Sequence, residues 1–164
     1  MNDATALTRL FLEAARFHLL QQYLPWLRAC LAQLPEEDIW WRPNAASNSA
    51  GNLLLHLCGN VRQWILHGIA GRPDVRVREA EFAASGPLPK AELLQQLETT
   101  LAEVDGVLQH LTAEDLPQPR RIQGFDQTVL RAVFHVVEHF SYHTGQIIYL
   151  TKLRTGVDLK FWNL

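Results

Sequence analysis

Apolar side chains recur at helical spacing in four long stretches of the chain. These are residues 4–33, 49–67, 90–111 and 128–154. Pro25 falls inside the first stretch, where it removes one backbone donor, so we expect a kink near Gln21 to Tyr23. The stretches show no alternation typical of a β-strand. The pattern therefore predicts an all-α fold, an up-down four-helix bundle with long connecting loops.

The second stretch is apolar over more than half of its helical circumference and has one narrow polar stripe. The stripe carries no formal charge and consists of Asn52, His56, Asn60, Gln63 and His67. A stripe that faces solvent usually carries Lys or Glu, so this one favours a polar cleft inside the molecule, with a modestly polar exposed face as the alternative. The wide apolar surface exceeds what one four-helix bundle has to cover, which favours a homodimer.

The fourth stretch carries His135, His139 and His143 at an unbroken spacing of four. Four residues turn about 400° and rise about 6 Å, so each imidazole lies one turn above the last. With His139 at zero, His143 falls at about 40° and borders the apolar face of the helix, whereas His135 falls at about -40° and points away from it. Two imidazoles at this spacing can reach one metal ion, and the angles favour the pair His139 and His143.

Cofactor sites in helix bundles form in the core from side chains of facing helices. His56 in the middle of the second helix, together with His139 and His143, would supply three nitrogen ligands and leave one coordination position open, as in catalytic metal sites. Neutral imidazoles favour one divalent ion, zinc or nickel.

Two amides lie one turn after histidines of this set. Asn60 follows His56 and Gln146 follows His143, so both are candidates to orient the ligating imidazoles, with ordinary hydrogen bonding between helices as the alternative. No Asp or Glu accompanies His56 on its own stripe, and His67 on that stripe is about 16 Å away, at 1.5 Å per residue. The sequence therefore offers no general base for the site.

Residues 70–89 connect the second and third helices and contain three prolines and two glycines. Loops of this length inside compact domains are usually functional or mobile, so we expect a long ordered loop or a lid. Its arginines, Arg72, Arg76 and Arg78, either pair with Glu79 or Glu81 at the surface or help to bind a small anionic molecule.

Among the remaining segments, residues 34–38 are expected to end the first helix and start a short one. Trp40 and Trp41 are interpreted as a packing plug under a loop, with a place in a substrate pocket as the alternative. Residues 112–127 are expected to be a connector. Phe161 and Trp162 are expected to fold back over one end of the bundle.

Length and composition fit one compact domain, residues 1–164. Of the 164 residues 48% are hydrophobic, which suffices for a substantial core.

Fifteen basic and seventeen acidic residues give a formal charge of -2 without a block of like charge, so nothing indicates nucleic acid as a partner. There is neither a signal-peptide pattern nor an apolar run of about 18 residues, and we expect a cytoplasmic protein without membrane contact. Cys30 and Cys58 are interpreted as small buried apolar residues.

Two stretches resemble the DinB-like superfamily of metal-dependent proteins, also called YfiT-like. They are residues 48–60, which contain His56, and residues 136–152, in which His139-x-x-x-His143 is followed by Gly145-Gln146. Residues 78–82 are similar to one branch of the superfamily, which has no assigned function. The resemblance covers most of the chain and implies a four-helix bundle, ligand roles for the three histidines, and a homodimer. Members with known activity are thiol-dependent transferases and isomerases that use bacillithiol, mycothiol or glutathione.

Two classes of function follow. The first is a metal-dependent enzyme acting on a small molecule, in first place an S-transferase that uses a low-molecular-weight thiol, with a metal-dependent hydrolase as a variant. The second is a non-catalytic metal-binding or stress-related module. Structural zinc sites normally have four protein ligands, and no fourth ligand appears at suitable spacing, which favours the enzyme.

Overall fold

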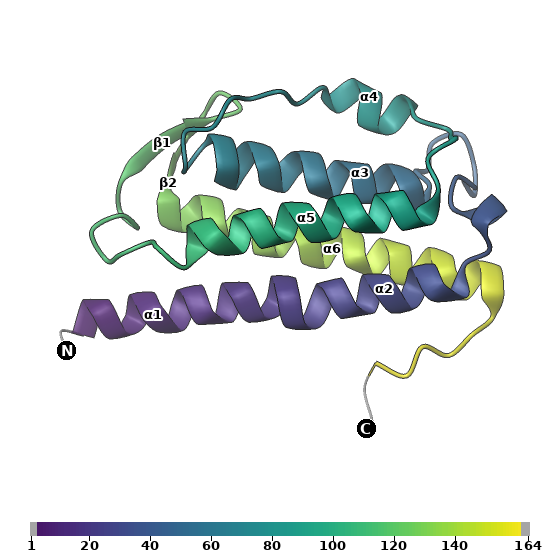
Figure 1. The fold of residues 1–164 in the computed structure, drawn as a ribbon, viewed down its shortest axis with the longest axis horizontal. Helices are drawn as coiled ribbons and strands as arrows, with labels where there is room; N and C mark the ends of the chain where they lie inside the picture. Colours follow the sequence, from purple (N-terminus) through teal and green to yellow (C-terminus); the bar gives the residue numbers. More distant parts are fainter. Residues whose placement is uncertain (1–2, 162–164) are drawn as a thin grey trace.

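A computed structural model, which describes residues 3–161, folds the chain into four long helical rods packed as a bundle (Figure 1). The first rod comprises α1 (Asp3–Arg16), the π-helical turn η1 (Phe17–Tyr23) and α2 (Leu24–Gln33). The second comprises α3 (Ala50–Val61) and its π-helical continuation η3 (Arg62–His67). The third and fourth are α5 (Lys90–Leu108) and α6 (Val129–Thr155), and a short 3₁₀ turn, η2 (Glu36–Asp38), follows α2. The predicted helical bundle is confirmed.

The first rod passes Pro25 by changing its hydrogen-bond pattern. Proline has no N–H and its ring crowds the preceding turn. The chain therefore widens into η1, and the backbone N–H of Leu24 bonds to the carbonyl of Leu19, five residues back. The irregularity expected near Gln21 to Tyr23 lies within this turn.

Side-chain caps define where α3 and α6 begin. Ser49 accepts a hydrogen bond from the backbone N–H of Asn52, and the Asn52 side chain accepts one from the backbone N–H of Ser49, which together form a capping box. Thr128 accepts from the backbone N–H of Arg131 at the start of α6. Gly156 follows α6 in the left-handed conformation, with φ of 68°.

The helices α3 and α5 run in the same direction, whereas an up-down bundle reverses direction at every helix, so the expected up-down order was wrong at this point. Gly51 at the start of α3 donates to the carbonyl of Ile39, and the Lys90 ammonium at the start of α5 donates to the carbonyl of Leu34 at 2.8 Å. Both helices therefore begin beside the end of α2. The segment between them, residues 68–89, crosses back along the whole bundle and carries the short helix α4 (Arg78–Ala83) over the outer side of α3 (Figure 1).

The connector between the third and fourth helices contains two strands, which the all-α prediction did not include. The strands β1 (Pro119–Ile122) and β2 (Phe125–Thr128) form an antiparallel hairpin. Its two turn residues, Gln123 and Gly124, both have positive φ, 52° and 81°, as in the tight turns that suit twisted hairpins. Ile122 anchors the hairpin against Gly68, where an added Cβ would lie 2.5 Å from the Ile122 side chain.

Almost all of α3 is buried within this single chain. It packs against α5, α6 and α4 and so occupies the centre of the molecule. The wide apolar surface of the second helix is thus used inside one protomer. It gives no argument for a second copy, and the homodimer stays a prediction.

Aromatic side chains close one end of the bundle. The Trp40 indole donates to the carbonyl of Leu88 at 3.1 Å, and Trp41 lies under the guanidinium of Arg154. The predicted packing role of both tryptophans is confirmed. Phe161 folds back as expected and stacks on Trp26 with ring centroids 5.1 Å apart, while Trp162 lies outside the described residues. Both cysteines are buried, which raises the pKa of Cys30 to about 11 and that of Cys58 to about 12.

Candidate metal centre

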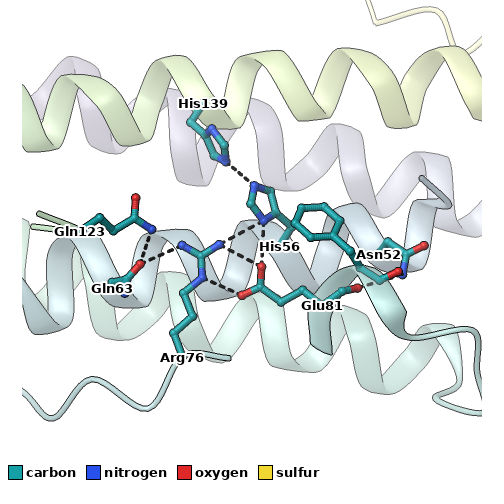
Figure 2. A network of polar contacts seen from close by, with 8 residues as sticks. Asn52, His56, Gln63, Arg76, Glu81, Gln123 and His139 are labelled. Carbon is teal, nitrogen blue, oxygen red and sulfur yellow. Dashed lines mark hydrogen bonds and ion pairs between the residues drawn. The ribbon is translucent and has the colours of Figure 1, made fainter. Parts of the chain in front are cut away.

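Three histidines converge between α3 and α6. His56 Nε2 lies 3.0 Å from His139 Nε2 (Figure 2). The His143 ring lies 4.4 Å from the His139 ring and 4.9 Å from the His56 ring, centroid to centroid. One possible ligand atom from each residue lies within 4.8 Å of the other two. The structure thus brings together the three histidines that the sequence singled out.

The spacing and chemistry of this cluster fit a divalent metal ion. Two nitrogen ligands at about 2.0 to 2.1 Å from a tetrahedral zinc ion are about 3.3 to 3.4 Å apart, close to the separation of the His56 and His139 nitrogens. A proton or a cation has to lie between these two nitrogens, because two facing lone pairs would repel each other. Three imidazoles are a donor set that zinc and nickel both accept.

Burial holds two imidazoles of the cluster, those of His139 and His143, in the form that binds metal. Desolvation, with smaller contributions from His143 and His56, lowers the pKa of His139 to about 3. Desolvation also lowers the pKa of His143, although the hydrogen bond with Gln146 opposes this effect. A metal binds the neutral ring, so at pH 7 neither of these side chains has to release a proton first.

His135 lies outside the cluster, but it packs against the buried Trp64 and does not point away from the core as the helical angles predicted. Its ring packs 4.0 Å from the Trp64 ring and 5.4 Å from the His139 ring, centroid to centroid. Burial lowers the pKa of His135, and the negative charge of Glu138 partly offsets this. The structure therefore leaves His135 beside the three-histidine cluster and packed on an indole.

A buried carboxylate holds the far side of His56. Glu81 Oε2 accepts a hydrogen bond from His56 Nδ1 at 2.8 Å, and Arg76 binds the same carboxylate through Nε at 2.7 Å and Nη2 at 2.9 Å (Figure 2). The Arg76 and Glu81 side chains are only 4% and 9% exposed. Arg76 Nη2 also lies 3.1 Å from His56 Nδ1, but both atoms are donors when Glu81 accepts from the imidazole, so the guanidinium proton goes to Glu81.

The sequence offered no acidic side chain on the stripe that carries His56, and the carboxylate that binds His56 comes from another element. Glu81 comes from α4, on the segment that crosses over α3, and not from the helix that carries His56. Burial raises the pKa of the Glu81 carboxyl, but the hydrogen bonds from Arg76 and His56 outweigh burial and leave this pKa below its usual value. Glu81 is thus ionised and fully engaged, which makes it a poor general base.

The uncharged polar stripe of the second helix is covered by this crossing segment. Asn52 Nδ2 donates to the backbone carbonyls of Glu81 at 2.9 Å and Ala84 at 2.7 Å. Gln63 Oε1 accepts from Arg76 Nη1 at 3.0 Å. Asn52 and His56 are buried, as is Asn60. This part of the stripe therefore lies inside the molecule, as predicted, whereas Gln63 and His67 are half-buried.

The arginines of the crossing segment have partners within the chain. Arg72 bonds to Glu103, Arg76 is bound by Glu81, and the Arg78 guanidinium lies over the Phe82 ring. Because these contacts occupy them, they give no support to a pocket for a small anion.

Gln146 and Asn60 differ in how they meet the cluster. Gln146 Oε1 accepts from His143 Nδ1 at 2.7 Å, so this amide holds one imidazole of the cluster directly. Asn60 is 3% exposed, and its Oδ1 has no hydrogen-bond partner among the described residues.

Pockets for small molecules usually have volumes of about 300 to 1,000 Å³, and a cavity of about 650 Å³ opens beside His143. Gln146, which bonds to His143, lines it, as does Tyr142, whose ring centroid lies 4.9 Å from that of His143. The opposite wall is the loop before α3. The described side chains that line the cavity are all uncharged: Pro43, Asn44, Ala46, Ser47, Asn48, Leu53, Tyr142, Gly145, Gln146, Tyr149, Leu150 and Leu153.

Comparison with known proteins places the fold but names no activity. Residues 6–163 match a family described as "Protein of unknown function (DUF1572)". No curated protein matches the chain. The crystal structure of a DinB-like protein, YjoA from Bacillus subtilis, is similar with a TM-score of 0.66 and 16% sequence identity, over 88% of this chain and 93% of that one. This likeness confirms the predicted DinB-like fold. In the part of the chain that the structure describes, no helix has the length and apolar character to cross a membrane.

Proposed function

The chain belongs to the DUF1572 family of proteins of unknown function, and we propose from its site that it is a metal-dependent enzyme. The observation that carries the proposal is the buried convergence of His56, His139 and His143, with a possible ligand atom from each within 4.8 Å of the others. They would hold one divalent ion, zinc or nickel, and leave a coordination position open. Gln146 and Asn60 would border the site.

The reaction we propose is the transfer of a low-molecular-weight thiol to a small electrophile. A bound ion would supply the charge that lowers the pKa of an incoming thiol or water. Three imidazole ligands add no negative charge, and burial of the cluster limits the access of water. The thiol sulfur forms a bond to an electrophilic carbon, the leaving group departs with its bonding electrons, and the thiol proton goes to solvent.

The cavity beside His143 supports a small-molecule substrate. Its volume of about 650 Å³ is in the range of ligand pockets, and two of its lining residues, Gln146 and Tyr142, contact His143. Because its lining side chains are uncharged, it favours a substrate without formal charge at this end.

Other functions would use the same cluster. A hydrolase would bind water in place of the thiol, and a non-catalytic metal-binding or stress-related module would bind only the ion. We further propose that the protein is cytoplasmic and a homodimer.

Metal analysis of the purified protein tests the proposal first. We expect one equivalent in the wild type, none in His139→Ala, and one in His135→Ala, because His135 lies outside the cluster. A panel of thiols with a reactive electrophile, with and without added zinc or nickel, then tests transfer. A full equivalent of metal in His139→Ala would sink the ligand assignment. Metal binding without thiol transfer or hydrolysis would leave the binding module.

A further inference from the structure

We infer that Glu81 is a positioning residue for His56, and that it couples metal binding to the docking of α4 on α3. The inference rests on the proposed metal site. It assigns no new ligand to the ion, and it gives the crossing segment a defined role at the cluster.

The hydrogen bond to Glu81 selects the tautomer of His56. An ionised carboxylate can only accept hydrogen bonds, so the 2.8 Å contact places a proton on His56 Nδ1. In the neutral ring this leaves the lone pair on Nε2, the atom that faces His139. Arg76 fixes the carboxylate by binding both of its oxygens. His56 is therefore held with the correct nitrogen available to the ion.

The surface of α3 leaves room for the Glu81 carboxylate at Gly59. A Cβ added at Gly59 would lie 1.9 Å from Glu81 Oε1 and 2.9 Å from Arg76 Nε. The ion pair therefore fits against α3 only because residue 59 has no side chain. Gly106 in α5 is different, since an added Cβ there would meet nothing within 4 Å. The close approach of the carboxylate is thus built into α3 independently of His56.

The short helix α4 docks on α3 through hydrogen bonds of its backbone and of Glu81. A helix of six residues does not persist alone in water, so α4 depends on its contacts. Asn52 binds the carbonyls of Glu81 and Ala84, and Arg42 donates to the carbonyl of Phe82 at 2.7 Å. The Glu81 side chain adds His56 to these contacts. The two effects are linked thermodynamically: if Glu81 in docked α4 increases the affinity for the ion, the bound ion stabilises docked α4 by the same free energy.

Two variants and two matched controls test the coupling. Glu81→Ala removes the acceptor, and Gly59→Ala displaces it while placing a better helix former in α3. Glu79→Ala, on the exposed side of α4, and Gly106→Ala are the controls. Zinc affinity is measured by competition with a chelator, and hydrogen exchange of residues 76–84 is followed with and without zinc. The ¹⁵N shifts of His56 in the metal-free protein report its tautomer, and circular dichroism checks the helices.

We expect zinc affinity to fall about 10- to 100-fold in Glu81→Ala and Gly59→Ala and to change less than about twofold in the controls. Zinc should slow exchange of residues 76–84 in the wild type and the controls, and much less in the two variants. His56 should carry its proton on Nδ1 in the wild type and exchange between tautomers in Glu81→Ala.

Failure of the inference and failure of the proposed function give different results. If the wild type binds zinc and both variants bind it equally well, the positioning role is overturned and the metal site stands. If the wild type binds no zinc, the proposed function fails. In that case the tautomer of His56 in the metal-free protein still tests the positioning role, because an Nδ1 proton that persists in Glu81→Ala contradicts it.

Discussion

Gln146 and Asn60 occupy equivalent places in the sequence but different places at the cluster. Gln146 accepts a hydrogen bond from the Nδ1 of His143, which leaves the other ring nitrogen for the ion. Asn60 lies on α3 between His56, which contacts His139, and Trp64, which contacts His135. Asn60 is therefore packed between these two contacts of α3 with α6 and does not hold an imidazole in place.

We expect Gln146→Ala to weaken zinc binding about 10-fold or more, because His143 loses the acceptor that orients its ring. Asn60→Ala should have a smaller effect, since no hydrogen bond to a histidine is lost. Chelator competition at pH 7 measures both. A larger loss in Asn60→Ala than in Gln146→Ala would mean that Asn60, and not Gln146, is the amide that supports the site.

Local periodicity explains why the histidines could be predicted and Glu81 could not. His139 and His143 lie one turn apart on a single helix, so their common direction follows from their spacing alone. The pairing of Glu81 with His56 depends on how a 20-residue crossing, residues 70–89, lies over α3, which no pattern within one helix encodes. The only local signals were the lack of charge on the polar stripe and the missing side chain at Gly59.

At the scale of the elements, Ser49 serves two contacts at once. It is fully buried, it caps α3, and it donates its hydroxyl proton to Asn52 Oδ1 at 2.6 Å. The amide nitrogen of Asn52 in turn binds the backbone of α4. The start of α3 and the docking of α4 therefore share one hydrogen-bond network.

Ser49→Ala should lower the free energy of unfolding by about 1 to 2 kcal/mol, the upper part of the range for a lost N-cap, because the site is buried. Thr128 caps α6 through a longer bond of 3.3 Å near solvent. The variant Thr128→Ala should therefore lower the free energy of unfolding less, by about 0.5 to 1 kcal/mol. Urea denaturation of both variants measures the difference. Equal losses would show that the buried network adds nothing to the ordinary cap.

The long helices could be read from the sequence and the short elements could not. Each rod contains several turns, so its apolar stripe is visible, and its caps are local. The hairpin strands have four residues each and α4 has six, too few for a period to appear. Their positions follow from tertiary contacts, such as the packing of Ile122 on Gly68, that the sequence pattern does not contain.

At the scale of the whole molecule, the surface of α6 is the place to examine for a second copy. Large apolar side chains are exposed along this helix: Leu130, Phe134, Tyr142, Tyr149 and Leu153. Exposed apolar groups that follow one helix are more unusual than scattered ones and often mark contacts between proteins. They give the homodimer a surface that the buried α3 does not.

Light scattering at micromolar concentration should give twice the chain mass of 18.7 kDa. Replacing Phe134 by Ser should lower the fraction of dimer, whereas replacing the exposed Phe17 on the first rod should not, if α6 provides the interface. A monomeric mass for the wild type would remove the homodimer prediction.

The crossing between α3 and α5 has a consequence for how the site can vary. Two neighbouring helices joined by a tight turn can exchange contacts with that turn only at their ends. A crossing that returns the full length of the bundle passes over α3 (Figure 1). It brings Glu81 and Arg76 to His56 in the middle of that helix (Figure 2). Most of its residues do not belong to the core, so substitutions within it leave the packing of the four rods unchanged. The electrostatic surroundings of the histidines can therefore evolve separately from the scaffold that holds them.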